Sequence, residues 1–205
     1  MQLFEEVAIV SDRTNADVAD ALRRVLESFC LRVHYYQLVQ RRQAVELFGN
    51  GGPRCDYTIF VAHGFSDDQG PAIRFDIRDN PSADPNAVEG WFLTTLDLRP
   101  ELIREMFKHV RGTYVTNACG GGHEALAEAF LDVGCSAYIG STESGPQTTS
   151  TMLFVIGLFY FLQAEVHDYA PHAFTLEEAV NRASGLHADW PGGTGAFRCY
   201  TKDSR

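Results

Sequence analysis

Short apolar runs typical of buried strands alternate along this chain with segments whose apolar residues recur at helical spacing. The predicted strands are Val7–Val10, Leu31–Leu38, Tyr57–Ala62, 113–117 and Ala137–Gly140. The predicted helices follow Asn15, span Gln40–Phe48, start at Pro100, and span Glu124–Leu131. Such alternation predicts an α/β fold with a mostly parallel central sheet covered by helices on both faces. This is a three-layer α-β-α sandwich, built as one domain over residues 1–205.

The hydrophobic pattern loosens after Phe65. A turn is predicted at Asp67–Pro71, an exposed strand at Ala72–Ile77, and a strand that pairs back with it at Trp91–Leu96. Gly, Pro, Asp and Asn are frequent in Phe65–Glu89. We therefore expect this segment to border a ligand cleft and to be poorly ordered without a ligand.

The last third of the chain returns to a clear pattern. Thr151–Glu165 is strongly apolar and predicts a helix that is central to the packing. Thr175–Glu178 has the sequence of a capping box, which predicts the start of a helix that reaches Leu186. A glycine turn and a final strand around Tyr200 complete the predicted order.

Two of the predicted strands end in side chains that can carry chemistry. Tyr57–Ala62 runs into His63 and Gly64, and 113–117 runs into Cys119, which is followed by three glycines. In a parallel sheet, ligands bind at the carboxyl ends of the strands. A thiol and an imidazole delivered to that edge form a nucleophile and its base. A helix directly after Cys119 would favour the thiolate through its dipole.

Composition and charge narrow the classes of partner. Apolar residues make up 45% of the 205 residues, which indicates a globular protein, and the net charge is −10 with a pI of about 5.1. There is no run of Lys and Arg, so nucleic acid is not expected as a partner. The longest apolar run, Met152–Leu162, is too short to span a bilayer, so no membrane association is expected.

The cysteines and the first residues indicate a compartment. The first six residues lack the basic and apolar segments of a signal peptide. The five cysteines include no CxxC pair, so neither a disulfide framework nor a zinc site is predicted, and no metal or cofactor is expected. A reducing cytoplasm fits this pattern. Four of the cysteines are interpreted as small buried hydrophobes: Cys30, Cys55, Cys135 and Cys199.

Together these motifs resemble the clan CD cysteine peptidases, which include caspases, gingipains and CHAT domains. His63-Gly64 and Asn117-Ala118-Cys119-Gly120-Gly121 each follow an apolar strand, and the Cys stands 56 positions after the His (119 − 63). The helix Leu126–Phe130 and the strand end Ile139–Ser141 are most similar to gingipain and CHAT sequences. The resemblance covers roughly Val7–Ser141.

This resemblance implies a caspase-like fold and an intracellular cysteine endopeptidase with a Cys-His dyad. Cys119 would be the nucleophile and His63 the general base, with the N–H groups of Gly64 and Cys119 as the oxyanion hole. No cofactor is implied. The partners would be a protein or peptide substrate and, as in larger effector systems, an activating protein.

The resemblance also implies where the S1 pocket would form. Its three contributing positions correspond to Asp12, Asn117 and Glu143 here, and two of these are acids. We therefore expect cleavage after Arg or Lys, although Arg13 beside Asp12 would favour an acidic residue instead. The caspase sequence Gln-Ala-Cys-Arg-Gly is absent, so caspase-like aspartate specificity is not implied.

Two alternatives remain open at this point. The chain could be a catalytically silent caspase-like binding module. It could also be a doubly wound domain in which Gly120–Gly122 hold the phosphate of a nucleotide, although the chain lacks the Walker lysine and the GxGxxG spacing. His123 could be a second base or the cap of the following helix.

Overall fold

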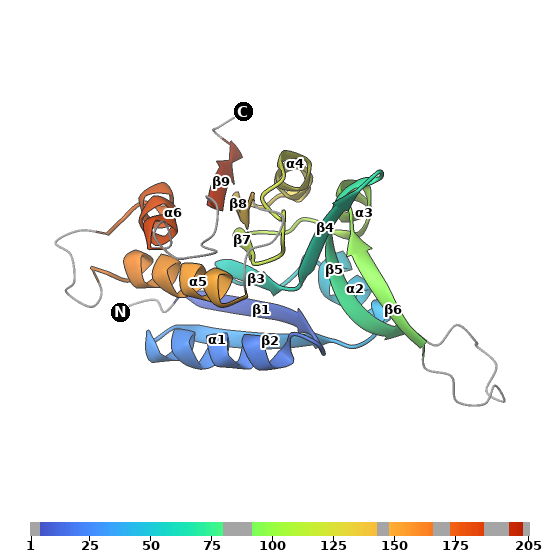
Figure 1. Ribbon diagram of the computed structural model, residues 1–205, viewed down its shortest axis with the longest axis horizontal. Helices are drawn as coiled ribbons and strands as arrows, with labels where there is room; N and C mark the ends of the chain where they lie inside the picture. Colours follow the sequence, from blue (N-terminus) through green and yellow to red (C-terminus); the bar gives the residue numbers. More distant parts are fainter. Residues whose placement is uncertain (1–4, 80–91, 143–147, 166–172, 187–196, 203–205) are drawn as a thin grey trace.

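The predicted alternation of strands and helices forms a three-layer α/β/α sandwich (Figure 1). The computed structural model describes residues 5–79, 92–142, 148–165, 173–186 and 197–202. Its strands are β1 Glu6–Asp12, β2 Arg32–Leu38, β3 Tyr57–Val61, β4 His63–Asp67, β5 Gly70–Asp79, β6 Phe92–Leu98, β7 Thr113–Thr116, β8 Ala137–Ser141 and β9 Phe197–Thr201. Its helices are α1 Ala16–Ser28, α2 Arg41–Gly49, α3 Pro100–Met106, α4 Glu124–Val133, α5 Thr148–Leu162 and α6 Leu176–Gly185.

The central sheet has six strands in the order β2-β1-β3-β7-β8-β9. The first five are mutually parallel, and β9 pairs antiparallel with β8 at the edge. The register places Val7 opposite Tyr57 and Phe60 opposite Thr116. The predicted mostly parallel sheet is therefore confirmed.

Side chains that alternate along the strands fill two separate cores, one on each face of the sheet. Val7, Ile9 and Val115 pack with the apolar faces of α1, α5 and α6. Val10 and Phe60 face the other way and pack with α2, α3 and α4. All five side chains have no solvent-accessible surface, which explains why these strands appear in the sequence as nearly continuous apolar runs.

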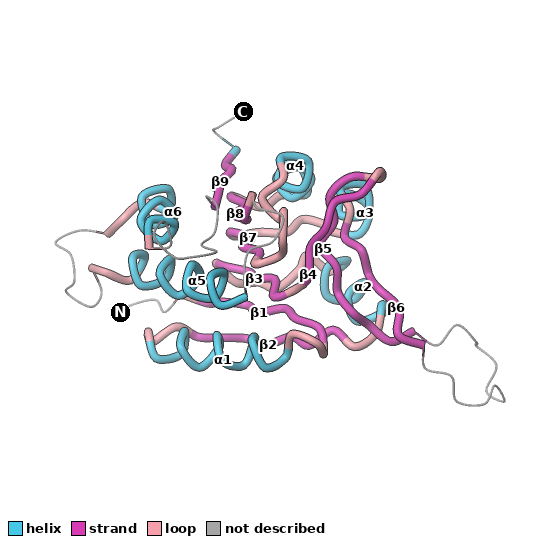
Figure 2. Tube along the Cα trace, viewed as in Figure 1, coloured by secondary structure: helices cyan, strands magenta, loops and turns pink. Residues whose placement is uncertain are grey.

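A smaller antiparallel sheet, in the order β4-β5-β6, stands beside the carboxyl ends of β1 and β3 (Figure 2). Only Ala62 separates β3 from β4, so the chain passes directly from the large sheet into the small one. The hairpin predicted between 72–77 and 91–96 is confirmed by the pairing of β5 with β6.

One prediction about this region is wrong. The strand expected to be exposed is buried, because Ile73, Phe75 and Ile77 contribute to the core around α2, α3 and α4. Residues 65–79 of the segment Phe65–Glu89 belong to β4, β5 and the turn between them, and the poor order expected for this segment without a ligand stays a prediction. The remainder of that segment lies outside the described residues.

The C-terminal helices follow the predicted pattern with shifted ends. The apolar helix α5 starts three residues earlier than predicted, at Thr148. At α6 the predicted capping box is confirmed, because the Thr175 side chain accepts the N–H of Glu178 and the Glu178 side chain accepts the N–H of Thr175.

Candidate active site

The two strands that precede His63 and Cys119 are neighbours in the sheet. β3 and β7 pair in parallel, with Ile59 opposite Val115 and Phe60 opposite Thr116. His63 follows the end of β3 by two residues, and Cys119 follows the end of β7 by three. The prediction that the two strands are adjacent and parallel is confirmed, and both residues lie at the same carboxyl edge.

Close backbone packing joins the two strand ends at Gly64. A Cβ atom added there would lie 2.8 Å from the Cys119 nitrogen and 2.9 Å from the Ala118 Cβ, and closer still to the Cys119 carbonyl oxygen. Only glycine permits this approach. Gly64, the residue that follows His63, is therefore held directly against the backbone of Cys119.

Asn117 fixes the relative position of the two strand ends. Its Oδ1 accepts the N–H of Ala62 at 3.0 Å, and its own N–H donates to the carbonyl oxygen of Phe60 at 3.1 Å. The side chain thus extends the β3–β7 pairing one step beyond the strands, immediately before His63. The sequence assigned the Asn117 side chain to the S1 pocket, and its Oδ1 atom is the acceptor of the hydrogen bond from Ala62.

The glycines after Cys119 form a compact turn that packs on β8. Gly120 has φ of 63°, a backbone conformation that favours glycine. The N–H of Gly121 donates to the Ala118 carbonyl at 2.9 Å, and the N–H of Gly122 donates to the Ser141 carbonyl at 2.7 Å. The turn is therefore tied both to itself and to the end of β8.

His123 is the N-cap of α4. Its Nδ1 accepts the N–H of Ala125 at 3.2 Å, and its own N–H donates to the Gly120 carbonyl at 3.1 Å. The capping role considered for this histidine is confirmed. The N–H groups of residues 121–123 all donate within the protein, so they do not form the open cradle that a phosphate requires.

Two tyrosines from neighbouring strands support the same turn. The Tyr138 hydroxyl on β8 donates to the Gly121 carbonyl at 2.6 Å, and the Tyr200 hydroxyl on β9 donates to the Gly122 carbonyl at 2.7 Å. Sequence reasoning missed both, because no local pattern connects these tyrosines with the glycines.

The resting charge of Cys119 differs from the expectation. The thiol is half-buried, and this burial raises its pKa. Helix α4 begins only at Glu124, beyond the first turn over which a helix dipole acts. The structure therefore places Cys119 outside the first turn of α4, where the predicted dipole stabilisation of a thiolate does not act, and burial favours the neutral thiol.

His63 is exposed and opens β4, where it pairs with Arg74 on β5. The Arg74 guanidinium is held by Asp97 through two hydrogen bonds of 2.7 Å, and it lies 4.1 Å from the centre of the Phe65 ring. The surface next to His63 is therefore ordered by a bidentate ion pair and a cation–π contact.

In the pairing of β4 with β5, the backbone of Gly64 makes no hydrogen bond to β5. Pro71 has no N–H, so its pair with Ser66 is of the non-hydrogen-bonded kind. Because the two kinds of pair alternate along an antiparallel ladder, the pair of Gly64 with Ile73 is also non-hydrogen-bonded. The Gly64 N–H thus points away from β5.

Asp12 is fully buried, and local donors occupy its carboxylate. Oδ1 accepts from the Thr14 hydroxyl at 2.8 Å and from both the backbone and side-chain nitrogens of Asn15 at 2.9 Å. Oδ2 accepts the N–H of Asp76 at 2.8 Å, which ties the end of β1 to β5. The structure therefore gives Asp12 a clear role in joining the two sheets. Glu143, the other predicted S1 acid, lies outside the described residues.

The remaining cysteines are not all buried as expected. Cys55 and Cys135 are buried, Cys199 is half-buried, and Cys30 is exposed, so the prediction for Cys30 is wrong. Burial raises the pKa of both Cys55 and Cys199 to about 11, which makes these thiols poor nucleophiles at neutral pH.

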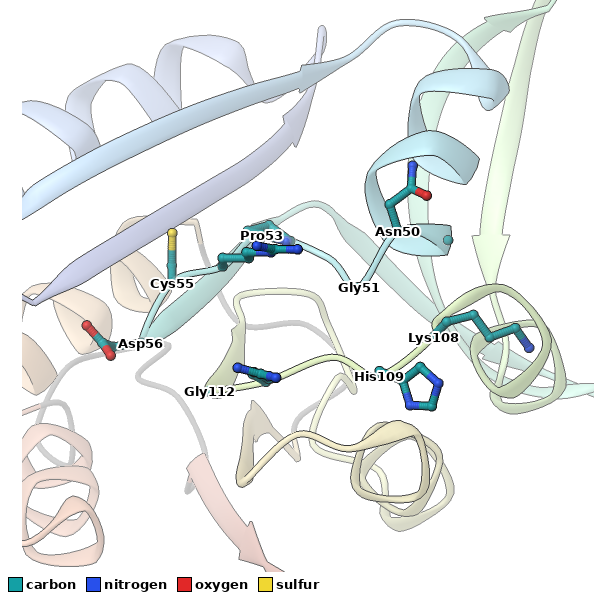
Figure 3. Close-up of a pocket in the computed structure, with 11 residues that line it drawn as sticks. Asn50, Gly51, Pro53, Cys55, Asp56, Lys108, His109 and Gly112 are labelled. Atoms are coloured by element: carbon teal, nitrogen blue, oxygen red, sulfur yellow. The ribbon is translucent and has the colours of Figure 1, made fainter.

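A cavity of about 540 Å³ lies at the opposite edge of the sheet (Figure 3). It is bordered by the loop that leads into β3, with Asn50 and Gly51, and by the loop that leads into β7, with Lys108 and His109. Neither His63 nor Cys119 lines it. The cavity and the candidate active site therefore lie at opposite edges of the sheet.

Comparison with known proteins assigns this chain to no family. No protein-family profile matches it, and no curated protein sequence matches it. The crystal structure of protein GSU0716 from Geobacter sulfurreducens is similar over 96% of this chain and 93% of that chain, with 11% sequence identity and a TM-score of 0.46. A likeness of this degree assigns no function. Within the described residues, no helix has the length and apolar character needed to cross a membrane.

Proposed function

We propose that this protein is a cysteine endopeptidase in which Cys119 is the nucleophile and His63 the general base. The observation that carries the proposal is the packing of His63-Gly64 against the backbone of Cys119 at the carboxyl ends of β3 and β7. The caspase-like resemblance of the motifs and the arrangement of the strands support the same reading.

The proposed reaction follows from the groups at this edge. His63 takes the proton of the Cys119 thiol as the sulfur attacks the carbonyl carbon of the scissile peptide bond. The N–H groups of Gly64 and Cys119 stabilise the oxyanion that forms. His63 then gives the proton to the leaving amine, and an acyl-enzyme thioester remains. A water molecule, deprotonated by His63, releases the carboxylic acid and restores the thiol.

The position of β4 favours a polypeptide substrate over a small molecule. β4 is an edge strand of the small sheet, and its outer side begins at His63 and Gly64. Unpaired backbone groups at a sheet edge bind an extended peptide by strand addition. A substrate held in this way would bring one of its carbonyl groups past Cys119.

The cysteine pattern supports a reducing compartment such as the cytoplasm. All five cysteines are free thiols in the structure. Disulfides are rare in the cytosol, and half-buried thiols that keep a nucleophilic function are compatible with that environment.

Labelling with peptide-based electrophiles, combined with a peptide library, tests the proposal. We expect covalent modification at Cys119 and cleavage of library peptides, both abolished in Cys119→Ala and both strongly reduced in His63→Ala. His123→Asn is the matched histidine control, because asparagine also caps helices. Cys30→Ser is the matched thiol control.

A catalytically silent binding module would give a different result. Cys119 would react no faster with a peptide-based electrophile than with a small alkylating agent of equal reactivity, and no library peptide would be cleaved. Loss of activity in His123→Asn with full activity in His63→Ala would show that His123, not His63, is the base. This result would contradict the proposed dyad.

A further inference from the structure

Three potential metal ligands meet at the amino-terminal edge of the sheet, opposite the candidate active site. Glu6 is the first residue of β1, His34 lies on β2, and Cys55 precedes the start of β3 by two residues. One ligand atom from each, a carboxylate oxygen, an imidazole nitrogen and the thiol sulfur, lies within 4.8 Å of the other two. Figure 3 shows the Cys55 sulfur pointing toward β1 and β2 and away from Lys108 and His109.

The hydrogen bonding of this cluster is incomplete. The Glu6 Oε1 is held by Arg32 at 2.7 Å, which turns Oε2 toward the His34 Nε2 at 3.5 Å. That separation is too long for a strong hydrogen bond. The His34 Nε2 atom is inaccessible to solvent, and the described part of the chain offers it no hydrogen-bond partner. A buried polar atom left in this state is costly unless something outside the chain binds it.

The spacing fits a tetrahedral zinc ion. Zinc binds nitrogen and oxygen at about 2.0–2.2 Å and sulfur at about 2.3 Å, so two of its ligand atoms stand roughly 3.4–3.6 Å apart. The 3.5 Å between Glu6 Oε2 and His34 Nε2 matches this value. The sulfur of Cys55 lies within 4.8 Å of both atoms, so it is the third donor atom of the same cluster.

The donor set also selects the metal. A thiolate with an imidazole and a carboxylate suits zinc, whereas magnesium and calcium prefer oxygen ligands alone. Cys55 is 8% exposed, so the same three residues are poorly placed to form a second nucleophilic triad that a peptide could reach.

We propose that Glu6, His34 and Cys55 bind a zinc ion that joins the amino-terminal ends of β1, β2 and β3, with water in the fourth position. Binding replaces the proton of the Cys55 thiol, which is released to solvent, by a zinc–sulfur bond. The ion fills the gap between Oε2 and Nε2. It adds a link among three strands that already meet at this end through backbone pairing, the Arg32–Glu6 ion pair and the hydrogen bond from the Glu6 N–H to the Asp56 carboxylate. This inference is independent of the proposed peptidase activity.

Metal binding by the full chain tests the inference, with Cys119→Ala as the background so that the candidate active site cannot supply a thiolate. We expect one zinc per chain after removal of excess metal, and no retention of magnesium. Cobalt(II) should give a thiolate-to-cobalt charge-transfer band and the intense visible bands of a tetrahedral site. Zinc should also raise the midpoint of thermal unfolding by several degrees, because it binds only the folded chain.

Ligand variants identify the site. Cys55→Ser should abolish the charge-transfer band, and His34→Gln and Glu6→Gln should each weaken zinc binding by about tenfold or more. Cys30→Ser, a change of thiol at an exposed position, should leave all readouts unchanged. The Cys119→Ala protein alone is sufficient to overturn the inference. Substoichiometric zinc, absence of the charge-transfer band, or weak octahedral cobalt spectra would each do so, whether or not the ligand variants fold.

Discussion

Replacing Gly64 with alanine should disturb the candidate active site more than the fold. The added Cβ would lie 2.8 Å from the Cys119 nitrogen and closer still to the Cys119 carbonyl oxygen, whereas ordinary contact begins at 3.4 Å, so one of the two backbones must move by more than about 0.6 Å. The neighbours are backbone atoms and the Ala118 Cβ, which cannot rotate away. Overpacking of this kind costs about 1–3 kcal/mol of unfolding free energy.

The expected effects differ in size between stability and activity. For a chain of this length, about 1–3 kcal/mol corresponds to a fall of roughly 2–12 °C in the midpoint of thermal unfolding. A displacement of the nucleophile that approaches 1 Å costs about 100-fold in rate, since attack requires close alignment. We therefore expect Gly64→Ala to remain folded and to lose on the order of 100-fold in the rate of peptide cleavage or of Cys119 labelling by a peptide electrophile.

Gly185→Ala is the matched control for this change. An added Cβ at Gly185 meets no atom within 4 Å, and the residue lies in α6, so the variant should be as stable as the parent or slightly more stable. Calorimetry and labelling kinetics on both variants complete the assay. Full stability and full reactivity of Gly64→Ala would show that His63-Gly64 is not held against Cys119, and the proposed dyad would lose its main support.

Three further changes test individual contacts. Asn117→Ala leaves the buried N–H of Ala62 without its acceptor and should cost about 1–3 kcal/mol by denaturant unfolding, whereas Asn117→Asp keeps an acceptor and should cost clearly less; equal losses would contradict the bond. Thr175→Ala removes half of the capping box and should cost about 1 kcal/mol, with no effect on labelling of Cys119. In His63→Ala, alkylation of Cys119 should rise about tenfold per pH unit through the neutral range, because burial raises the pKa of its thiol and only the thiolate reacts; a plateau near neutral pH would contradict this.

The sequence predicted the central sheet well because its strands are buried on both faces. Val7–Val10 is an unbroken apolar run with every side chain buried, and Tyr57–Ala62 is a mostly apolar run in which only Tyr57 is half-buried. The helices between them have clear periodicity. Adjacent placement of β3 and β7 then brings His63 and Cys119 to one edge by topology alone. The placement of these two residues at the same edge of the sheet was therefore the most predictable part of the candidate site.

The parts that sequence reasoning missed depend on contacts between distant segments. Burial of β5 was not visible, since Phe75 and Ile77 are covered by helices that no local pattern assigns to them. The proposed zinc ligands stand at positions 6, 34 and 55, one from each of three segments, so the search for a CxxC pair could not find them. The raised pKa of Cys119 results from the burial of its thiol, which depends on how the surrounding segments pack.

The sequence proposed two acids for the S1 pocket, Asp12 and Glu143. We expect them to differ in their effect on specificity for a basic residue before the cleaved bond. Asp12 is fully buried, and its two oxygens already accept four hydrogen bonds, so it has no free acceptor directed at a substrate. Asp12→Asn would turn an amide N–H₂ against the N–H of Asp76 if its oxygen keeps the bonds to Thr14 and Asn15. This buried clash of donors should cost about 1–3 kcal/mol of unfolding free energy.

The ratio of cleavage after Arg to cleavage after Leu should nevertheless remain unchanged in Asp12→Asn. Any preference for Arg or Lys should depend on Glu143 instead, and Glu143→Gln should lower that ratio by at least tenfold, as for a charged group that loses its partner in a desolvated pocket. Matched fluorogenic peptides that end in Arg, Lys, Asp or Leu provide the measurement. A collapse of the Arg preference in Asp12→Asn, with stability unchanged, would mean that the Asp12 carboxylate is released from its four donors when substrate binds. Preference for the Asp peptide in the parent protein would instead mean that Arg13 contacts the substrate side chain in the S1 pocket. A guanidinium pairs with an acidic substrate side chain, whereas a carboxylate in the pocket would repel that side chain.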